Sequence, residues 1–264
     1  MPKTVSKPNT KLILSQPIPP LFSPEKKIAL FFSAKSGCTF AVKWFFFQTG
    51  FLEVAQFYSD WIHDFRINVF YKSSQYKRNL QNILNQDTKI IKVVRNPYTR
   101  VVSSYLHAIR YGYENHSLSK FFNRQIDRDN GLSFRDYLSY LETQNLWQCN
   151  VHHRVQVHAA EKRGLVTPDY IIKLENSFED FRKVELDLNL NDSNLLNFRK
   201  SIHNTSRIEK STFCGDRQFC LSKQPKAFPP SKNFFNQELT QKVGKLYAID
   251  FKTYNYDQSI LDLN

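Results

Sequence analysis

The sequence predicts a three-layer α/β fold, in which a central parallel sheet is covered by helices on both faces. Apolar runs of strand length alternate along the chain with longer segments of helical pattern. In order, we expect a strand at 28–32, a helix at 38–48, a strand at 89–94, a helix at 97–110, a strand at 169–174 and a helix at 177–187. Strands that alternate with helices form a parallel sheet, because each helix returns the chain to the end of the sheet at which the previous strand began.

Length and composition predict one folded domain behind a short extension. The chain has 264 residues, 41% of them hydrophobic and 15% aromatic, which is enough for a full core. Residues 1–27 are rich in proline and indicate an extended or partly disordered lead-in, so the domain is expected at 28–264. The lead-in has no apolar run of the length of a signal peptide or membrane span, and we expect a cytoplasmic protein.

The remaining segments predict two further helices and two irregular regions. Ser133, followed by Asp136, indicates a helix start with an approximate capping box. A last helix is expected at 237–247, while 111–133 is interpreted as loop-rich and 201–233 as irregular. The aromatic run at 44–47 predicts that helix 38–48 is buried on most sides.

The loop from Ser33 to Thr39 has the composition of an anion-binding loop. The first N–H groups of a helix lack partners within the helix, and the helix dipole adds partial positive charge there. Gly37 allows the backbone to approach an anion closely, and Lys35 supplies a full charge. Because this lysine precedes the only glycine, the loop differs from the kinase loop G-x-x-x-x-G-K-[ST]. The loop therefore predicts a P-loop-like site for a phosphate or sulfate.

The strand at 89–94 runs directly into a second candidate phosphate site. Pro97 suits the first position of a helix and Asn96 suits its N-cap. Arg95 then lies at the carboxyl end of a strand, where open α/β sheets bind ligands. Ser103 lies about two helical turns further on, and an arginine with a hydroxyl nearby suits a terminal phosphate.

Together, these two segments resemble the sulfotransferases that use 3′-phosphoadenosine 5′-phosphosulfate as cosubstrate. The run Lys35-Ser36-Gly37-Cys38-Thr39 is similar to the loop that binds the 5′-phosphosulfate in that superfamily. Arg95 and Ser103 match the arginine and serine that bind its 3′-phosphate. The resemblance implies that Lys35 stabilises the leaving phosphate while residues 36–39 cradle it.

Later segments resemble the carbohydrate sulfotransferase branch, the chondroitin and dermatan type enzymes. His152 and Gln156 match that branch's His-Trp-x-Pro-Gln pattern, while His153 and Val155 replace its Trp and Pro. Segments similar to the branch also occur at 170–176, 203–206 and 246–256. The resemblance implies a carbohydrate acceptor. Animal enzymes of the branch have an N-terminal Golgi anchor, so this chain resembles a soluble bacterial-type member, and the Golgi lumen would apply only if an anchor had been removed.

Sulfuryl transfer to a hydroxyl needs a base for the proton and a cation on the leaving oxygen. Histidine suits the base near neutral pH, and the candidates are His63, His152 or another residue. A histidine between two aspartates, as at His63, is also common as a cap or an ion-pair partner. No metal is expected, because a sulfuryl group carries less charge than a phosphoryl group.

Four further interpretations concern residues outside these motifs. Arg100 is explained equally well by a helix-surface ion pair and by a cosubstrate contact. His107 is expected to be structural or to contact the cosubstrate. Asn204, Ser206 and Arg207 are candidates to close over the nucleotide. The pairing of Cys214 with Cys220 stays open, and the reduced state is favoured in a cytosolic chain.

The charge balance predicts an anionic partner. The formal net charge is +13 at pH 7. The basic residues are scattered without a stripe, which favours a nucleotide cosubstrate and an anionic or neutral carbohydrate over a nucleic acid. Two other classes remain: a P-loop phosphotransferase of kinase type, and a non-catalytic glycan- or nucleic-acid-binding protein. The absence of the GK[ST] order argues against the first, and the intact Lys35, Arg95 and Ser103 argue against the second.

Overall fold

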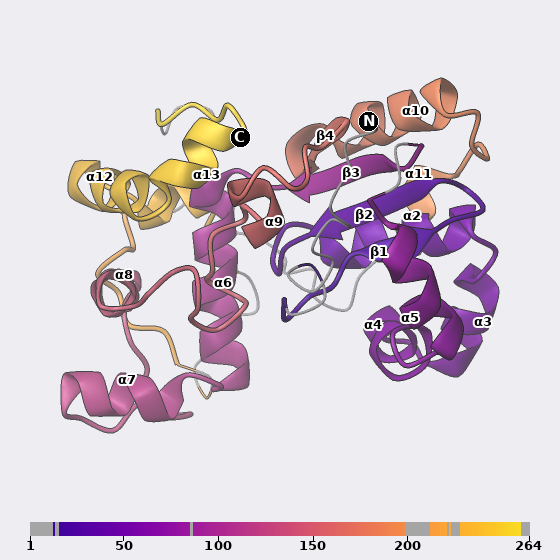
Figure 1. Cartoon of the computed structure of the whole chain (residues 1–264). Helices are drawn as coiled ribbons and strands as arrows, with labels where there is room; N and C mark the ends of the chain where they lie inside the picture. The colour runs from indigo at the N-terminus through magenta and orange to yellow at the C-terminus, as the bar shows by residue number, and fades with distance from the viewer. Residues whose placement is uncertain are drawn as a thin grey trace, which may run out of the picture. The chain divides into compact units, whose positions relative to one another are not determined.

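The computed structural model describes residues 13, 16–84, 87–198, 212–220, 222 and 228–259. The chain divides into two compact units, each assembled from two stretches of sequence (Figure 1). The first unit contains residues 1–94 and 156–203, and the second contains residues 95–155 and 204–264. Each unit has its own hydrophobic core.

The first unit is built on a four-stranded sheet of order β1-β2-β3-β4. Its strands are β1 (Leu21–Ser23), β2 (Ile28–Phe32), β3 (Lys89–Val94) and β4 (Tyr170–Lys173). Strands β2, β3 and β4 are parallel, whereas β1 is an antiparallel edge strand within the segment expected to lead into the domain. The predicted α/β class with a parallel core is confirmed, and the antiparallel edge is an addition to it.

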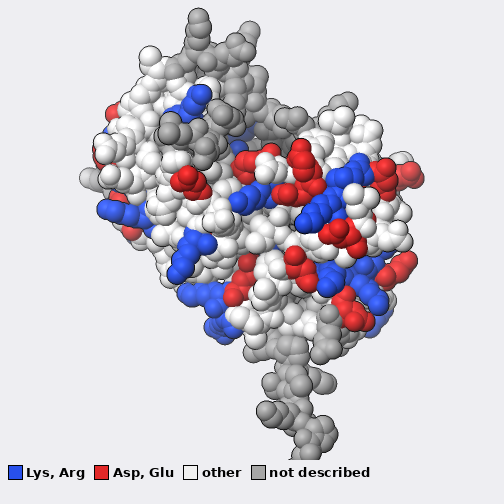
Figure 2. All heavy atoms as spheres, turned by 90° about the horizontal axis from the view of Figure 1, so that it is seen from above, with Lys and Arg blue, Asp and Glu red and all other residues white. Residues whose placement is uncertain are grey.

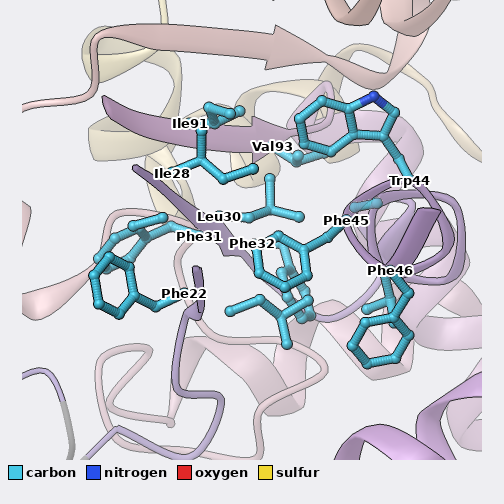
Figure 3. Packing of buried hydrophobic residues seen from close by; sticks show 14 of the residues in the cluster. Phe22, Ile28, Leu30, Phe31, Phe32, Trp44, Phe45, Phe46, Ile91 and Val93 are labelled. Atoms are coloured by element: carbon cyan, nitrogen blue, oxygen red, sulfur yellow. The ribbon is translucent and has the colours of Figure 1, made fainter. Parts of the chain in front are cut away.

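Successive side chains of β2 and β3 point to opposite faces of the sheet, and nearly all of them are buried. Both faces of the sheet are therefore covered by helices. On one face, Leu30 and Val93 point toward helix α2 (Cys38–Gln48), as Figure 3 shows. On the other face, Phe31 meets the ring of His158 at 5.1 Å between centroids. His158 is the N-cap of the short helix α9 (Ala159–Lys162).

Helix α2 is buried on most sides, as its aromatic run predicts. Trp44, Phe45 and Phe46 have no exposed surface. The indole Nε1 of Trp44 donates a hydrogen bond to Oε1 of Glu185 at 2.9 Å. Because Glu185 lies on α10 (Ser177–Asp187), this buried contact fixes α10 against α2.

A run of short helical elements lies between α2 and β3, and its first helices pack against α2. Its elements are α3 (Leu52–Tyr58), α4 (Ile62–Phe65), the π-helical turn η1 (Arg66–Phe70), α5 (Ser74–Asn79) and the 3₁₀ turn η2 (Leu80–Asn82). The rings of Phe46 and Phe65 are 5.5 Å apart, and those of Phe45 and Phe70 are 6.0 Å apart. These contacts hold α4 and η1 against α2. A 3₁₀ turn, η3 (Leu174–Asn176), and helix α11 (Leu195–Phe198) complete the unit.

The second unit is mainly helical. It contains α6 (Pro97–Tyr111), α7 (Asn115–Phe122), α8 (Phe134–Glu142), η4 (Ser231–Phe234), α12 (Gln237–Leu246) and α13 (Ala248–Thr253). Its core centres on Tyr105 of α6, whose ring contacts Phe134 and Phe234 at 5.4 and 5.9 Å.

The predicted helices of this unit agree with the structure to within a residue or so at their ends, but helices α7 and α13 were not predicted, and α13 follows the helix that was expected to be the last. The expected capping box at Ser133 is present, since its hydroxyl accepts from the Asp136 N–H and the Asp136 carboxylate accepts from the Ser133 N–H. Helix α6 ends where Gly112 adopts a left-handed conformation. The loop-rich interpretation of 111–133 is wrong for Asn115–Phe122, which forms α7 and buries Leu118.

Candidate functional site

The loop between β2 and α2 is shaped by hydrogen bonds between two serines. The hydroxyl of Ser36 donates to the carbonyl of Ser33 at 2.7 Å and accepts from the Ser33 N–H at 3.2 Å. Ser36 has no exposed surface. The hydroxyl of Ser36 therefore holds the loop in shape from inside.

Two residues of this loop adopt a left-handed backbone. Lys35 has φ = 67° and Gly37 has φ = 86°. A Cβ atom placed on Gly37 would lie 2.5 Å from Cδ1 of Leu174, so a side chain here would meet both strain and a steric clash. Glycine at this position lets the chain turn into α2 beside Leu174.

The N-terminus of α2 has the features of an anion site. Its N-cap is Gly37, no side chain caps it, and its first turn carries no acidic residue. The first N–H groups of such a helix are available to an anion, and the dipole favours negative charge there. With Lys35 in the same loop, the arrangement suits a phosphate or sulfate.

The structure brings His63 to this loop. Its Nε2 lies 3.2 Å from the hydroxyl of Thr39, and His63 is 5% exposed. The neighbouring Asp64 does not pair with it: the Asp64 carboxylate accepts from Ser59 and Asn68, both at 3.2 Å. His63 thus faces the first turn of α2, as a base for a group bound at this loop would require.

Gln156 is linked to the same loop through its backbone. Its carbonyl accepts from the hydroxyl of Ser33 at 3.3 Å and from the ammonium of Lys92 at 2.7 Å. Lys92 is buried on β3 and pairs with Glu161 of α9 at 2.9 Å. The start of the loop is therefore joined to β3 and α9 by a buried polar network.

In the second unit, Arg95 directly precedes the N-cap of α6 and Ser103 lies in the first half of that helix, and both residues are partly exposed. Asn96 caps this helix as predicted, because its Oδ1 accepts from the Tyr98 N–H at 2.9 Å and Pro97 takes the first position. The Arg95 Nε donates to the hydroxyl of Thr99 at 2.9 Å. This bond uses one of the five donors of the guanidinium.

The burial of Arg100 decides against one of its two interpretations. Arg100 is 1% exposed, and its guanidinium carbon lies 6.0 Å from the ring centroid of Tyr247. Of the two interpretations of Arg100, the helix-surface ion pair is therefore wrong, and the cosubstrate contact stays a prediction. Helix α6 carries Arg100 on its buried face, together with Val101 and Ser104.

His152 belongs to a group of aromatic rings in the second unit. Its ring lies 4.4 Å from that of His107 and 4.8 Å from that of Tyr113, with interplanar angles of 32° and 35°. Its Nδ1 is 2.9 Å from Oδ1 of Asn150. Because an amide oxygen only accepts, Nδ1 carries the proton, and Nε2 holds the lone pair when the ring is neutral.

His153, which replaces the Trp of the family pattern, is a buried neutral histidine. Burial, and next the charge of Arg100, lower its pKa to about 3. Its Nδ1 lies 3.1 Å from the hydroxyl of Tyr137. The carboxylate of Glu114 is 3.9 Å from its Nε2, and because the imidazole is neutral at pH 7 this contact is not an ion pair.

The comparison with known families assigns the chain. Residues 20–257 match the sulfotransferase family over nearly the whole sequence. The chain belongs to the sulfotransferase family. No curated protein and no solved structure matches it. Family membership supports sulfuryl transfer in general. In this sulfotransferase, the loop of Ser33–Thr39 with His63 beside it has the groups that such a transfer needs.

Two charged residues of this sulfotransferase were not predicted from sequence. Lys92 interrupts an apolar strand. This position could have indicated a buried ion pair, because a lysine in a strand buried on both faces needs an acidic partner. Arg66 lies one helical turn after His63 and is buried, with no earlier signal beyond that spacing. His203, Asn204, Ser206 and Arg207 lie outside the described residues.

Several structural findings bear on partners. In the described part of the chain, no helix is long and apolar enough to cross a membrane. Cys38, Cys149, Cys214 and Cys220 have free thiols. Among the described residues, no cluster of three metal-ligating side chains occurs. On the face shown in Figure 2, many basic side chains stand beside acidic ones.

Proposed function

We propose that this sulfotransferase transfers a sulfuryl group from 3′-phosphoadenosine 5′-phosphosulfate to a hydroxyl of a carbohydrate, with a histidine base. The observation that carries the proposal is the loop of Ser33–Thr39, with His63 at 3.2 Å from Thr39. Transfer of an anionic group to a hydroxyl needs a positively charged loop that binds the anion and, beside it, a base such as an imidazole.

In the proposed reaction the acceptor oxygen attacks sulfur and displaces the bridging oxygen in line. An oxygen–sulfur bond forms to the acceptor, while the bond between sulfur and the bridging oxygen breaks. The base takes the hydroxyl proton, and the leaving group is 3′-phosphoadenosine 5′-phosphate. Lys35 would neutralise charge that develops on the bridging oxygen, and the N–H groups of Gly37, Cys38 and Thr39 would hold the 5′-phosphate. Ser36, whose N–H donates to the Ser33 carbonyl at 3.3 Å, would complete the cradle by shaping the loop.

Arg95 and Ser103 would bind the 3′-phosphate, which distinguishes this cosubstrate from ATP. A guanidinium fork with an adjacent hydroxyl suits a terminal phosphate dianion. The family resemblance of both residues supports this role, as does the partial exposure of Arg95 just before α6 and of Ser103 on it.

His63 is the base that the geometry supports best, and His152 is the alternative. His63 contacts the loop that would hold the donor. His152 has a lone pair on Nε2 when neutral, and the hydrogen bond to Asn150 orients its ring. A carbohydrate acceptor rests on the resemblance of segments 149–156 and 170–176 to the carbohydrate branch. A cytoplasmic location remains a prediction from the sequence.

Titration calorimetry with 3′-phosphoadenosine 5′-phosphate, with 5′-AMP and ATP as controls, tests the cosubstrate. We expect micromolar binding of the bisphosphate and much weaker binding of both controls. Arg95→Ala should raise the cosubstrate KM about 10- to 100-fold through loss of a charged hydrogen-bonding group, whereas Arg110→Ala on the exposed side of α6 should not. Equal affinity for the bisphosphate and ATP would contradict the Arg95–Ser103 assignment.

The same preparation tests the catalytic roles. Lys35→Ala should lower kcat, and His63→Gln should lower kcat about 100- to 10,000-fold while the bisphosphate still binds. His152→Gln is the matched variant for the alternative base. If only His152→Gln lowers kcat, then the base is His152; if neither does, the histidine base is refuted.

A further inference from the structure

Arg66 is a buried cation that no carboxylate neutralises among the described residues. It lies on the π-helical turn η1 and is 9% exposed. Its guanidinium carbon is 5.3 Å from the ring centroid of Phe32 and 5.5 Å from that of Tyr71. Its Nε is buried and makes no hydrogen bond to a described group.

The surroundings of Arg66 do not compensate its charge. Two aromatic faces attract a cation, but less strongly than an anion does. Tyr71 does not supply a negative charge, because its hydroxyl donates to the carbonyl of Pro19 at 2.6 Å and burial raises its pKa to about 12. Buried charges in proteins are normally paired or coordinated, so an uncompensated one indicates that a ligand provides the anion.

The position of Arg66 indicates where that anion lies. Phe32 is the last residue of β2 and directly precedes the loop of Ser33–Thr39. Arg66 follows His63 by three residues, a spacing that places both side chains on one face of a helical segment. Since His63 contacts Thr39 and Arg66 covers Phe32, the two side chains approach the same loop from one helical segment.

We propose that Arg66 binds a sulfo or carboxylate group of a substrate beside His63. Either group presents oxygens that the planar fork of a guanidinium can hold through two N–H donors. The group is either the sulfuryl group of the donor or an acidic substituent of the acceptor. This inference deepens the proposed function and rests on it for the identity of the anion.

Thermal unfolding in sulfate tests the anion site without relying on sulfotransferase activity. Wild-type protein, Arg66→Met and the exposed control Arg78→Met are melted in sodium sulfate and in sodium chloride of equal ionic strength. Sulfate should raise the Tm of wild type and Arg78→Met by several degrees more than chloride does, and this excess should fall by at least half in Arg66→Met. An equal excess in all three proteins would overturn the proposal.

Substrate titrations separate the two sources of the anion. If Arg66 holds the sulfuryl group, Arg66→Met should weaken the phosphosulfate donor at least tenfold and leave 3′-phosphoadenosine 5′-phosphate within twofold. If it holds an acceptor group, the KM of a sulfated or carboxylated acceptor should rise tenfold while that of its neutral analogue does not change. Parallel weakening of donor and bisphosphate, or no change in any of these, would refute the role.

Arg66→Lys adds a check on geometry. A lysine keeps the charge but cannot form the two parallel hydrogen bonds, so it should restore only part of the affinity lost in Arg66→Met. Failure of wild type to bind the bisphosphate would refute the proposed cosubstrate, yet it would leave the sulfate melting result intact. The two hypotheses therefore fail by different measurements.

Discussion

Gly37 and Gly50 share a left-handed backbone but differ in their surroundings. Their φ angles are 86° and 75°, and only at Gly37 would an added Cβ meet a neighbour, Leu174, at 2.5 Å. Gly50 has nothing within 4 Å of that position. The pair therefore separates the cost of the backbone conformation from the cost of the close approach.

Gly37→Ala should destabilise the protein by about 1–3 kcal/mol more than Gly50→Ala, because both variants strain the backbone but only one overpacks. Urea unfolding of both variants measures the difference. Gly37→Ala should also weaken binding of 3′-phosphoadenosine 5′-phosphate, while Gly50→Ala should not. Equal stability and equal affinity in the two variants would show that the contact with Leu174 does not shape the loop.

At the residue scale, the loop of Ser33–Thr39 was easier to predict from sequence than the burial of single charged residues and the contacts of His63. The order of Lys35 and Gly37 after an apolar strand is a local pattern, and the structure places both in the turn that enters α2. The burial of Arg100 and Arg66 depends on which helix faces are covered, which local spacing does not determine. The approach of His63 to Thr39 likewise results from the packing of α4 on α2.

At the scale of elements, the ion pair of Lys92 and Glu161 joins β3 to α9. Both side chains are nearly inaccessible, at 2% and 6% exposure. The same glutamate accepts from the N–H of His158 at 3.0 Å and so closes the capping box of α9. One carboxylate thus neutralises a buried lysine and also caps the helix that covers it.

Glu161→Leu should cost about 3–5 kcal/mol of unfolding free energy, because it leaves Lys92 buried without its counter-ion. The double variant with Lys92→Met should recover much of that loss, since no charge then remains buried. Chemical denaturation of the single and double variants tests this. Asp87→Ala, which breaks the exposed pair with Lys27, is the control and should cost less than about 1 kcal/mol. A double variant no more stable than the single one would contradict the argument.

Elements were predicted where the local pattern was strong. The strands at β2 and β3 are continuous apolar runs, and α8 begins with a capping box, so each could be located from sequence. Strand β1 has three residues between prolines and a turn, which is too short to show a period. Helix α7 lies in a polar segment and buries only Leu118, so its apolar signal was weak.

At the scale of the whole molecule, the buried His153 and the partly buried His158 make stability depend on pH. Burial is the largest cause in both: it lowers the pKa of His153 to about 3 and, with the charge of Lys92, that of His158 to about 4. An unfolded histidine titrates near 6.5. Below pH 6.5 the unfolded chain therefore takes up protons that the folded protein excludes, and stability falls as the pH is lowered toward 4.

Each histidine should cost on the order of 2 kcal/mol at pH 5 relative to pH 7. Urea unfolding at both pH values measures this loss. His153→Gln should reduce the pH dependence by about half, because one of the two groups is gone, whereas His116→Gln on the surface should leave it unchanged. A wild-type midpoint that does not move between pH 7 and pH 5 would contradict the lowered pKa of both histidines in the folded protein.

The division of the chain into two units built from interleaved segments has a consequence for biosynthesis. Strand β4 belongs to the first unit, yet it is translated only after the whole first stretch of the second unit has been made. Until then β3 has no partner on its outer side, and an unpaired strand edge can bind other chains. A ribosome that stalls before residue 170 would therefore release a sheet with an open edge. The nascent protein has to keep this edge covered over the residues between Val94 and Tyr170, 95–169, a task suited to a chaperone that binds extended hydrophobic segments.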